Sequence, residues 1–260
     1  MTLTHVTRNV VKYSFMCNIA NSYNMPSVSF VIYSILRAGI FLQHNKMNEM
    51  RKIIVFGASG GTGKQVVHEA LNAGYEVTVI VRNTEDYIFG HPLLNIIHGD
   101  VFEPETFKSA MAGKDAVVSC LGYHKREPTT VYSEGITNIM KAMQAGGVKR
   151  LICLSNSAVE IPQNATFWMK FEIKNILQRL FKYSYADMLL MENILKDSGL
   201  NWTVIRPSRL LNSLKTGKYR ISINKKPIKP SSISRKDLAD YIFHHLFDEK
   251  IYKSKVEISY

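Results

Sequence analysis

From residue 51 onward, short apolar runs rich in β-branched residues alternate with segments whose apolar residues recur at helical spacing. The apolar runs predict strands over residues 51–56, 74–81, 94–98, 115–121, 150–154, 202–205 and 255–259. The segments of helical spacing predict helices over residues 64–73, 104–111, 130–145, 166–181, 186–196 and 235–247. Gly74 and Gly146-Gly147 are expected to close two of these helices, and Pro207 to stop the sixth strand. Such alternation predicts a single α/β domain, a doubly wound parallel sheet with helices on both faces.

The first 49 residues do not share this alternation. They carry four cations but one acid, Glu49, and their apolar stretch from Val28 to Leu42 is interrupted by Arg37. That stretch is shorter than the roughly 20 residues that a spanning helix needs, so no stable membrane span is expected. We therefore divide the chain into an N-terminal extension, residues 1–49, and a domain, residues 50–260. The extension is either a mitochondrial transit peptide or an upstream translated segment, since Met50 itself could start the protein.

The first predicted strand breaks into a glycine-rich turn, Gly57-Ala58-Ser59-Gly60-Gly61-Thr62-Gly63, and a helix follows at once. Gly57 permits a tight turn, Gly60 lets a pyrophosphate approach the backbone, and Gly63 lets the helix pack closely on the sheet. The free N–H groups around Gly61 and Thr62 then face the phosphates at the positive end of the helix dipole. A plain tight turn is the alternative, but the strand, turn and helix together predict a dinucleotide site of the Rossmann type.

The residue after the second strand indicates which dinucleotide binds. A site that prefers NAD places an acidic residue there to hold the ribose 2′-hydroxyl. This chain has Arg82-Asn83 at that position, and an arginine can hold a 2′-phosphate through a forked contact. Arg82 therefore predicts NADPH as the cofactor. The alternative is that Arg82 merely ends a strand in solvent.

Ligands of such sheets bind outside the carboxyl ends of the strands, so the residues just past each strand are the site candidates. Asp100 is a candidate acceptor for the adenine amine, or else a cap for the next helical turn. Leu121-Gly122 offers a flat backbone surface for a ribose or nicotinamide. Ser155, Asn156 and Ser157 lie where nicotinamide and substrate should meet, and they are the catalytic candidates; a turn or helix cap would explain the same residues.

One missing pattern bears on the chemistry. Alcohol-oxidising short-chain dehydrogenases pair a tyrosine with a lysine four residues later, and none of the thirteen tyrosines of this chain has one. Ordinary carbonyl chemistry is therefore disfavoured. A conjugated acceptor, such as a flavin or a linear tetrapyrrole, would demand less of a protein acid because the cofactor carries the hydride. Binding of NADPH without turnover is also compatible with this pattern.

Composition excludes other classes. The net charge of +12 suits an enzyme of anionic ligands, and no RNA-binding strand motif, zinc finger or helix-turn-helix pattern is present, so nucleic acid is not an expected partner. The three cysteines have neither metal nor redox spacing, which favours a reduced, cytoplasmic location and no metal site. The basic tract from Arg209 to Lys229 is interpreted as a solvated loop, or else as attraction for an anionic substrate. His244-His245 is interpreted as structural.

Several segments together resemble a known family. They are the glycine turn, Ala73–Val79 with Val81-Arg82, Gly99-Asp100-Val101, Gly113–Val118, Leu121-Gly122 and Pro128–Gly135. The chain from about Met50 resembles the atypical short-chain dehydrogenases of the NmrA-like, NADP-binding group that contains biliverdin IXβ reductase, also called NADPH-dependent flavin reductase. The resemblance implies a monomeric Rossmann-type enzyme that uses NADPH to reduce flavins and open tetrapyrroles.

The resemblance also implies roles for particular residues. It places cofactor contacts on Gly57, Ser59, Gly60, Gly61, Thr62, Gly63, Arg82, Asp100, Val101, Leu121 and Gly122. The family's active-site serine falls within residues 155–157, and a direct alignment puts Asn156 there. The family's histidine after the sixth strand falls near Arg209, which becomes the substrate candidate. We therefore expect an NADPH-dependent reductase of a small, conjugated, anionic acceptor, with an NADP(H)-binding redox sensor without turnover as the alternative.

Overall fold

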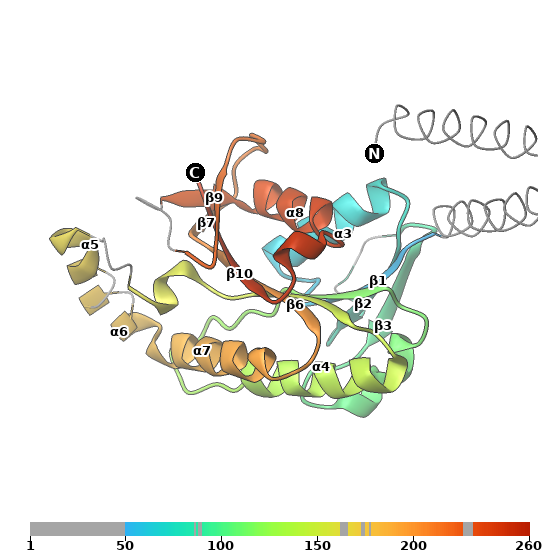
Figure 1. The fold of residues 1–260 in the computed structure, drawn as a ribbon. Coiled ribbons are helices and arrows are strands. Elements are labelled where there is room, and N and C mark those ends of the chain that lie inside the picture. The colour runs from blue at the N-terminus through green and yellow to red at the C-terminus, as the bar shows by residue number, and fades with distance from the viewer. Residues whose placement is uncertain are drawn as a thin grey trace, which may run out of the picture. The chain divides into compact units, whose positions relative to one another are not determined.

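The computed structural model describes residues 50–85, 87, 90–161, 166–172, 175–176, 178–225 and 231–260 (Figure 1). The extension expected over residues 1–49 lies outside the described residues. Residues 50–260 form one compact unit.

An eight-stranded sheet forms the centre of this unit, in the order β3-β2-β1-β4-β5-β6-β10-β8. Its strands are β1 (Lys52–Phe56), β2 (Glu76–Val81), β3 (Leu94–His98), β4 (Ala116–Ser119), β5 (Arg150–Leu154), β6 (Asn201–Pro207), β8 (Arg220–Ile223) and β10 (Ser254–Ser259). All neighbours run parallel except β8, which is antiparallel to β10. Two short strands, β7 (Arg209–Leu211) and β9 (Ser232–Ser234), form a separate parallel pair. The predicted α/β, doubly wound fold is confirmed.

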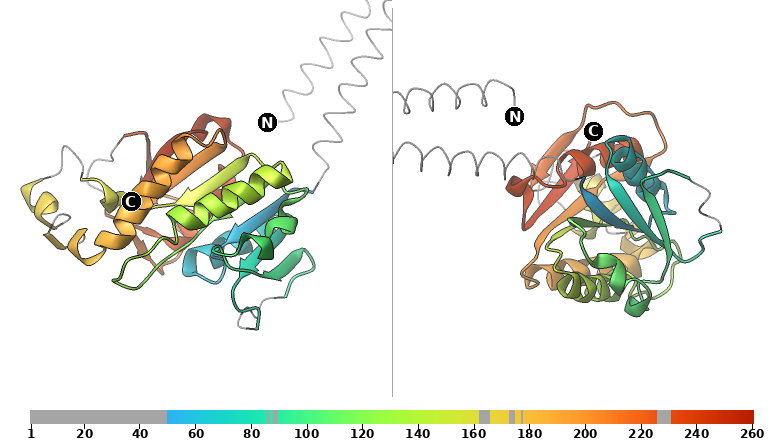
Figure 2. Two further views of the ribbon diagram at one scale, coloured as in Figure 1. Left: turned by 90° about the horizontal axis from the view of Figure 1, so that it is seen from below. Right: turned by 90° about the vertical axis from the view of Figure 1, so that its right-hand side faces the viewer.

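Helices cover both faces of the sheet, as Figures 1 and 2 show. Helices α3 (Gly61–Asn72) and α8 (Arg235–His244) pack together on one face, and α4 (Ser133–Gly146) and α7 (Lys182–Lys196) on the other. Short helices complete the domain: η1 (Pro104–Thr106), η2 (Lys108–Met111), η3 (Ser157–Val159), α5 (Phe167–Glu172), α6 (Gln178–Leu180) and η5 (Glu249–Ile251).

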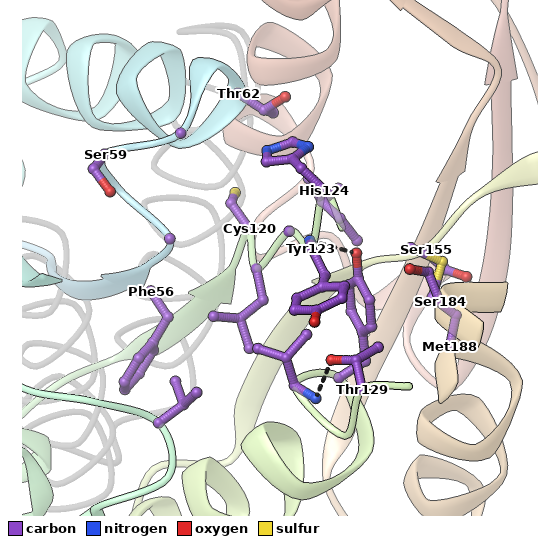
Figure 3. Close-up of a pocket in the computed structure, with 18 of the residues that line it drawn as sticks. Phe56, Ser59, Thr62, Cys120, Tyr123, His124, Thr129, Ser155, Ser184 and Met188 are labelled. Atoms are coloured by element: carbon purple, nitrogen blue, oxygen red, sulfur yellow. Dashed lines mark hydrogen bonds between the residues drawn. The ribbon is translucent and has the colours of Figure 1, made fainter. Parts of the chain in front are cut away.

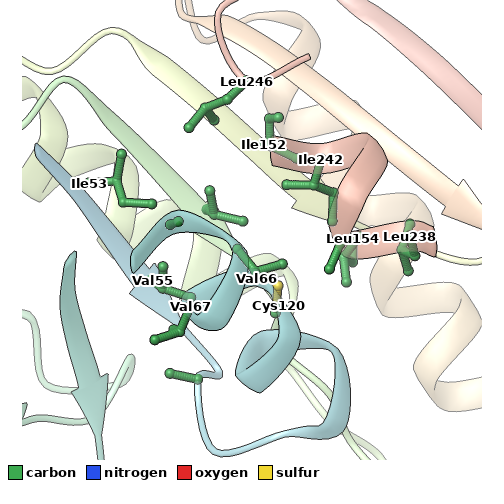
Figure 4. Close-up of a cluster of buried hydrophobic side chains, with 14 of the residues drawn as sticks. Ile53, Val55, Val66, Val67, Cys120, Ile152, Leu154, Leu238, Ile242 and Leu246 are labelled. Carbon is green, nitrogen blue, oxygen red and sulfur yellow. The ribbon is translucent and has the colours of Figure 1, made fainter. Parts of the chain in front are cut away.

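The alternation of side chains along each strand divides the apolar residues between two cores. In β1, Ile53 and Val55 belong to the cluster under α3 and α8 (Figure 4), whereas Ile54 and Phe56 belong to the cluster under α4 and α7. Successive side chains of a strand point to opposite faces, so a strand covered on both sides must be apolar at every position. This is why β1 appears in the sequence as an unbroken apolar run.

Helix α4 begins three residues later than the sequence predicts. The carboxylate of Asp187, on α7, accepts hydrogen bonds from Tyr132 N (2.8 Å) and Ser133 N (3.3 Å), and also from the Ser133 hydroxyl. These contacts satisfy N–H groups that a helix start leaves unpaired. At the other end, Gly147 follows the helix with φ of +74°, as its glycine pair predicted.

The sixth strand ends at Pro207, as predicted, but it includes Pro207 and so extends two residues beyond the expected end at Ile205; Pro207 pairs with Ile258 of β10. The carbonyl of Ile205 faces β5, where it accepts from Ser155 N. Since backbone groups alternate sides along a strand, the nitrogen of Pro207 also faces β5. The pairing with β5 has ended by then, so the missing N–H costs no hydrogen bond.

Three other expectations differ from the structure. The basic tract after Arg209 contains β7 and β8 as well as loop, and residues 226–230 of it lie outside the described residues. The helix expected over 104–111 consists of two 3-10 turns, η1 and η2. Of the helix expected over 166–181, the structure describes α5, a π-helical stretch at residues 175–176 and α6, and residues 173, 174 and 177 lie outside the described residues.

Candidate functional site

A cavity of about 810 Å³ opens at the carboxyl ends of β1 to β6 (Figure 3). It lies where the strand order reverses, because the chain goes from β1 to β2 on one side and returns to β4 on the other. Parallel sheets bind their ligands at such a point. Most of the predicted site residues line this cavity: Gly57, Ser59, Gly60, Gly61, Thr62, Arg82, Asp100, Val101, Leu121, Gly122, Ser155 and Asn156.

The glycine turn packs so closely on neighbouring backbone that two of its glycines leave no room for a Cβ. Gly57 has φ of +70°, and a Cβ added there would lie 2.3 Å from the carbonyl oxygen of Cys120, just past β4. A Cβ on Gly63 would lie 2.2 Å from the carbonyl oxygen of Gly57. Gly63 does not line the cavity, and its role is the close packing of α3 against the turn. Both glycines are therefore required by the backbone geometry.

The start of α3 has the features of an anion-binding site. Its N-cap is Gly60, which has no side-chain cap, and its first turn carries no acid. The N–H groups at the first positions of a helix lack intrahelical partners and lie at the positive end of the dipole. Since Gly61 and Thr62 line the cavity, these donors are available to a pyrophosphate there.

Arg82 lies directly after β2, exposed and at the cavity, where a ribose 2′-phosphate is expected. Asp100 lines the cavity, and its Oδ1 accepts a hydrogen bond of 3.0 Å from Phe102 N in the turn after β3; it does not cap the next helical turn, because the N-cap of η1 is Glu103. The carbonyl of Val101 accepts from the Asn138 side chain at 2.9 Å, which ties α4 to the cavity wall.

Arg235 is a cavity residue that sequence reasoning missed. It is the first residue of α8, and a Cβ on Gly61 would lie 2.8 Å from its Nε. Its Nη1 donates to Asn212 Oδ1 at 2.7 Å. A guanidinium is thus held directly above the start of α3, where it adds positive charge to the anion site. No local pattern indicates this role, because Gly61 and Arg235 are 174 positions apart in the sequence.

The other half of the cavity is lined by side chains from the α4 and α7 region. Tyr132, Phe181, Ser184, Tyr185 and Met188 lie there. The Tyr132 hydroxyl accepts from Tyr123 N at 3.0 Å, which fixes the ring. Burial, with a smaller contribution from the nearby Tyr132, raises the pKa of Tyr185 to about 12. The Tyr185 hydroxyl is therefore protonated at neutral pH. Tyr185 has Leu189, not lysine, four residues later, so it is not part of a tyrosine–lysine pair.

Ser155 is the catalytic candidate that the structure places at the cavity and ties to a buried ion cluster. Its hydroxyl donates to Glu192 Oε1 at 2.8 Å. Glu192 is fully buried on α7, and pairs with Arg206 of β6 and with Lys255 of β10, whose Nζ lies 2.7 Å from Glu192 Oε2. Burial disfavours the charged form of Glu192. Hydrogen bonds and charge from Arg206, with smaller contributions from Lys255 and Ser155, outweigh it and hold the Glu192 pKa below its ordinary value.

The remaining candidates lie differently. Asn156 lines the cavity but is the N-cap of η3, and its Oδ1 accepts from Ala158 N at 2.8 Å. Ser157 is buried and does not line the cavity. Arg209 is exposed on β7, outside the cavity lining, and among the described residues the lysines and arginines that line the cavity are Arg82, Lys125 and Arg235. The cap interpretation thus describes Asn156, and a substrate role for Arg209 stays a prediction.

The residues present fit a nicotinamide dinucleotide. The uncapped helix start, the glycines with no room for a Cβ, and the cations at the cavity suit a pyrophosphate and its riboses. In agreement, residues 57–249 match the NAD(P)H-binding protein family. The chain belongs to this family, whose fold is that of the atypical short-chain dehydrogenases.

Relatives in sequence have several roles. An uncharacterized chloroplastic protein of Arabidopsis thaliana is 28% identical over 217 residues, which cover 80% of this chain and 76% of that protein. The photosystem II assembly factor Ycf39 of Cyanophora paradoxa is 29% identical over 66% of this chain and 49% of its own. The (4-alkanoyl-5-oxo-2,5-dihydrofuran-3-yl)methyl phosphate reductase of Streptomyces griseus is 26% identical over 62% of this chain and 49% of its own. The chain therefore spans about half the length of the last two proteins.

Solved structures share the fold. A short-chain dehydrogenase/reductase from Veillonella parvula in complex with NADP superimposes with a TM-score of 0.69 at 18% identity, covering 82% of this chain and 95% of that one. The anaerobilin reductase ChuY of Escherichia coli O157:H7 superimposes with a TM-score of 0.65 at 17% identity, covering 80% of this chain and 96% of that one. Among the described helices, none has the length and apolar character that crossing a bilayer requires.

Replacing Gly57 by alanine should destabilise the domain and weaken NAD(P)H binding, because the new Cβ meets the Cys120 carbonyl at 2.3 Å. We expect a loss of more than about 2 kcal/mol, the left-handed φ accounting for about 1–2 of it. Gly74→Ala is the matched control, since Gly74 has φ of +80° with nothing within 4 Å of the added Cβ. Denaturant unfolding and cofactor titration measure both effects. Equal losses in the two variants would show that the contact with Cys120 is unimportant.

Glu192→Gln should remove stability at neutral pH, because it leaves the Arg206 guanidinium buried without its main counter-charge. The expected loss is about 3 kcal/mol. The pKa of Glu192 is lower in the folded state than its ordinary value of 4.5. The contribution of Glu192 to stability is therefore fully present above pH 4.5 and is lost as the pH falls through the folded-state pKa. The difference from wild type should therefore shrink below about pH 4.5 in urea unfolding. Glu105→Gln, at a side chain that is 81% exposed, is the control and should change little.

Proposed function

We propose that the protein is an NADPH-dependent reductase that transfers hydride to a conjugated acceptor, of the flavin or linear-tetrapyrrole kind. The observation that carries this proposal is a single cavity with two unlike halves. One half is built from glycine backbone, a helix start and cations, and the other from tyrosine, phenylalanine, methionine and serine side chains. A flat conjugated ring system suits the second half, where aromatic side chains can stack on it.

The preference for NADPH over NADH rests on Arg82. A guanidinium beside the adenosine ribose can hold a 2′-phosphate with two charge-assisted hydrogen bonds, and it leaves a 2′-hydroxyl without its acidic partner. The acid close by, Asp100, already accepts from the backbone of Phe102.

The bound cofactor would supply the hydride, and the chain's own residues would orient the acceptor and provide a proton. The Ser155 hydroxyl donates its hydrogen to Glu192, so its oxygen is left to accept a hydrogen bond from a ligand in the cavity. Ser155 would position the ligand through this bond. Tyr185 retains its proton and is the group that we assign as donor to the reduced acceptor. Burial raises the pKa of Cys120 to about 12, which leaves the thiol neutral and without a nucleophilic role.

An anionic acceptor is favoured by Lys125, which lines the cavity. The names of two similar proteins agree with this class: one reduces a phosphate ester of a conjugated furanone, and the other is an anaerobilin reductase. The acceptor class for this chain is our inference from the lining residues.

A second candidate function is NADP(H)-dependent binding to a partner without turnover. Several relatives are named photosystem II assembly factors, which favours it. In this case the cavity would hold the cofactor as a signal, and Tyr185 would be dispensable. Turnover separates the two candidates.

The decisive experiment measures NADPH oxidation with FMN, riboflavin and biliverdin as acceptors. We expect turnover with at least one of them, and a loss of at least about tenfold in NADPH affinity for Arg82→Ala, since two charge-assisted hydrogen bonds are removed. Lys108→Ala, whose side chain lies away from the cavity on η2, is the control and should behave as wild type.

Each of three results would contradict a different part of these proposals. Equal affinity for NADH and NADPH would remove the role given to Arg82. Tight NADPH binding with no oxidation by any acceptor would favour the binding protein over the reductase. Unchanged turnover in Tyr185→Phe would remove Tyr185 as the proton donor while leaving the reductase intact.

We also propose an organellar location of the plastid type, in place of the cytoplasmic location expected from composition. Two Arabidopsis relatives are named chloroplastic. In plastid-bearing cells, a fluorescent fusion of the full chain should enter plastids, whereas one that starts at Met50 should stay in the cytosol. Cytosolic fluorescence of both fusions would contradict the proposal, and mitochondrial fluorescence of the first would support the transit-peptide alternative. The monomeric state stays a prediction that light scattering can test.

A further inference from the structure

Large apolar side chains are exposed together on α5 and α6. Phe167, Trp168 and Phe171 of α5 are 74%, 76% and 48% exposed, and their rings touch edge to face with centroids 5.8 and 6.4 Å apart. Ile176, Leu180 and Phe181 continue this surface toward α7, each more than a third exposed. We call these six residues the aromatic patch. Figures 1 and 2 show α5 and α6 projecting from one end of the sheet.

The surroundings of the patch are cationic. Residues 166–182 contain four cations, Lys170, Lys174, Arg179 and Lys182, and one acid, Glu172, which gives a net charge of +3. Arg179 and Lys182 are exposed. Exposed aromatic residues combined with lysine and arginine on a short helix are the features of segments that lie in the interface of an anionic bilayer. Protein interfaces differ, because lysine is depleted from them.

We propose that the aromatic patch binds the surface of an anionic lipid bilayer. Trp168 and its neighbours Phe167 and Phe171 enter the headgroup region, while Arg179 and Lys182 contact lipid phosphates. This attachment goes beyond the reductase proposed above and needs no spanning helix.

The patch is continuous with the cavity. Phe181 belongs to the patch and also lines the cavity, next to Ser184 and Tyr185 of α7. A bilayer bound at the patch therefore lies at the acceptor half of the cavity, away from the cofactor half at α3. An amphipathic acceptor could pass from lipid to Tyr185 along Phe181.

The chain has two tryptophans, so fluorescence tests the proposal directly. Trp168 is 76% exposed and Trp202 is 6% exposed, which means that a change of environment on binding reports Trp168. The full chain is mixed with phosphatidylcholine vesicles that contain or lack phosphatidylglycerol. We expect a blue shift, and quenching by brominated lipid, with the anionic vesicles. Trp168→Phe should abolish both signals and leave sedimentation with the vesicles nearly unchanged.

A patch variant separates this surface from residues 1–49. The triple change Phe167→Ser, Trp168→Ser and Phe171→Ser should weaken sedimentation with anionic vesicles by at least about tenfold, since each aromatic side chain loses its burial in lipid. The matched control is Leu190→Ser with Leu214→Ser, at side chains 52% and 78% exposed outside the patch. Far-ultraviolet circular dichroism and oxidation of NADPH by a soluble acceptor should match wild type in both variants. These readouts keep this test distinct from that of the reductase.

Three outcomes would overturn the proposal. The first is vesicle binding by the triple variant as tight as that of wild type. The second is binding without any change in Trp168 emission. The third is a Trp168 shift that depends on protein concentration in the absence of lipid, which would identify the patch as a contact with a second copy of the chain.

Discussion

The guanidinium of Arg206, on β6, is buried and pairs with three carboxylates, those of Glu160, Glu192 and Glu257. Taking such charges out of water costs several kcal/mol for each ion, so the cluster stabilises the fold only when all its members are in place. Its members come from α7, β6, β10 and the segment before α5. The position of α7 relative to the sheet is thereby fixed, and with it the positions of Ser184 and Tyr185 at the cavity. Ser155 joins the same cluster from the end of β5.

The two halves of the cavity are built by different means. Backbone forms the cofactor half: a turn with φ of +70° at Gly57, a helix start without a side-chain cap, and carbonyls too close for any Cβ. Side chains form the acceptor half, and they can change without disturbing the sheet. Relatives of one fold can thus keep the cofactor while the acceptor varies, which agrees with the different roles of the proteins that this chain resembles.

The cofactor half could be predicted from sequence because each of its signals is local. Gly57 to Gly63 follow a strand directly, and Arg82 ends the next one, so position along the chain gives position in space. The acceptor half has no such signal. Tyr185 reaches the cavity through the packing of α7 on α4, and Arg235 through the packing of α8 on α3. Glu192 is linked to the cavity through Ser155 and belongs to an ion cluster assembled from distant segments.

The same distinction explains the errors. The strand expected to end at Ile205 continues to Pro207, because the nitrogen of Pro207 faces the side where β5 has ended. The antiparallel strand β8 lies in a basic tract whose charges conceal its pairing with β10. Asn156, interpreted as catalytic, caps η3, because an amide after a strand serves either purpose equally well in a sequence.

The place of β10 in the sheet has a consequence for the synthesis of the protein. This strand, Ser254–Ser259, lies between β6 and β8, although among the strands described it is the last to leave the ribosome. Until it does, β6 has an open edge, and Arg206 lacks Glu257 and Glu192 lacks Lys255. The nascent chain therefore carries a half-formed charge cluster beside an unpaired strand, a state that invites association with other chains. Co-translational folding should leave this domain incomplete until residue 259 has emerged, so chaperones that shield strand edges would act late on it.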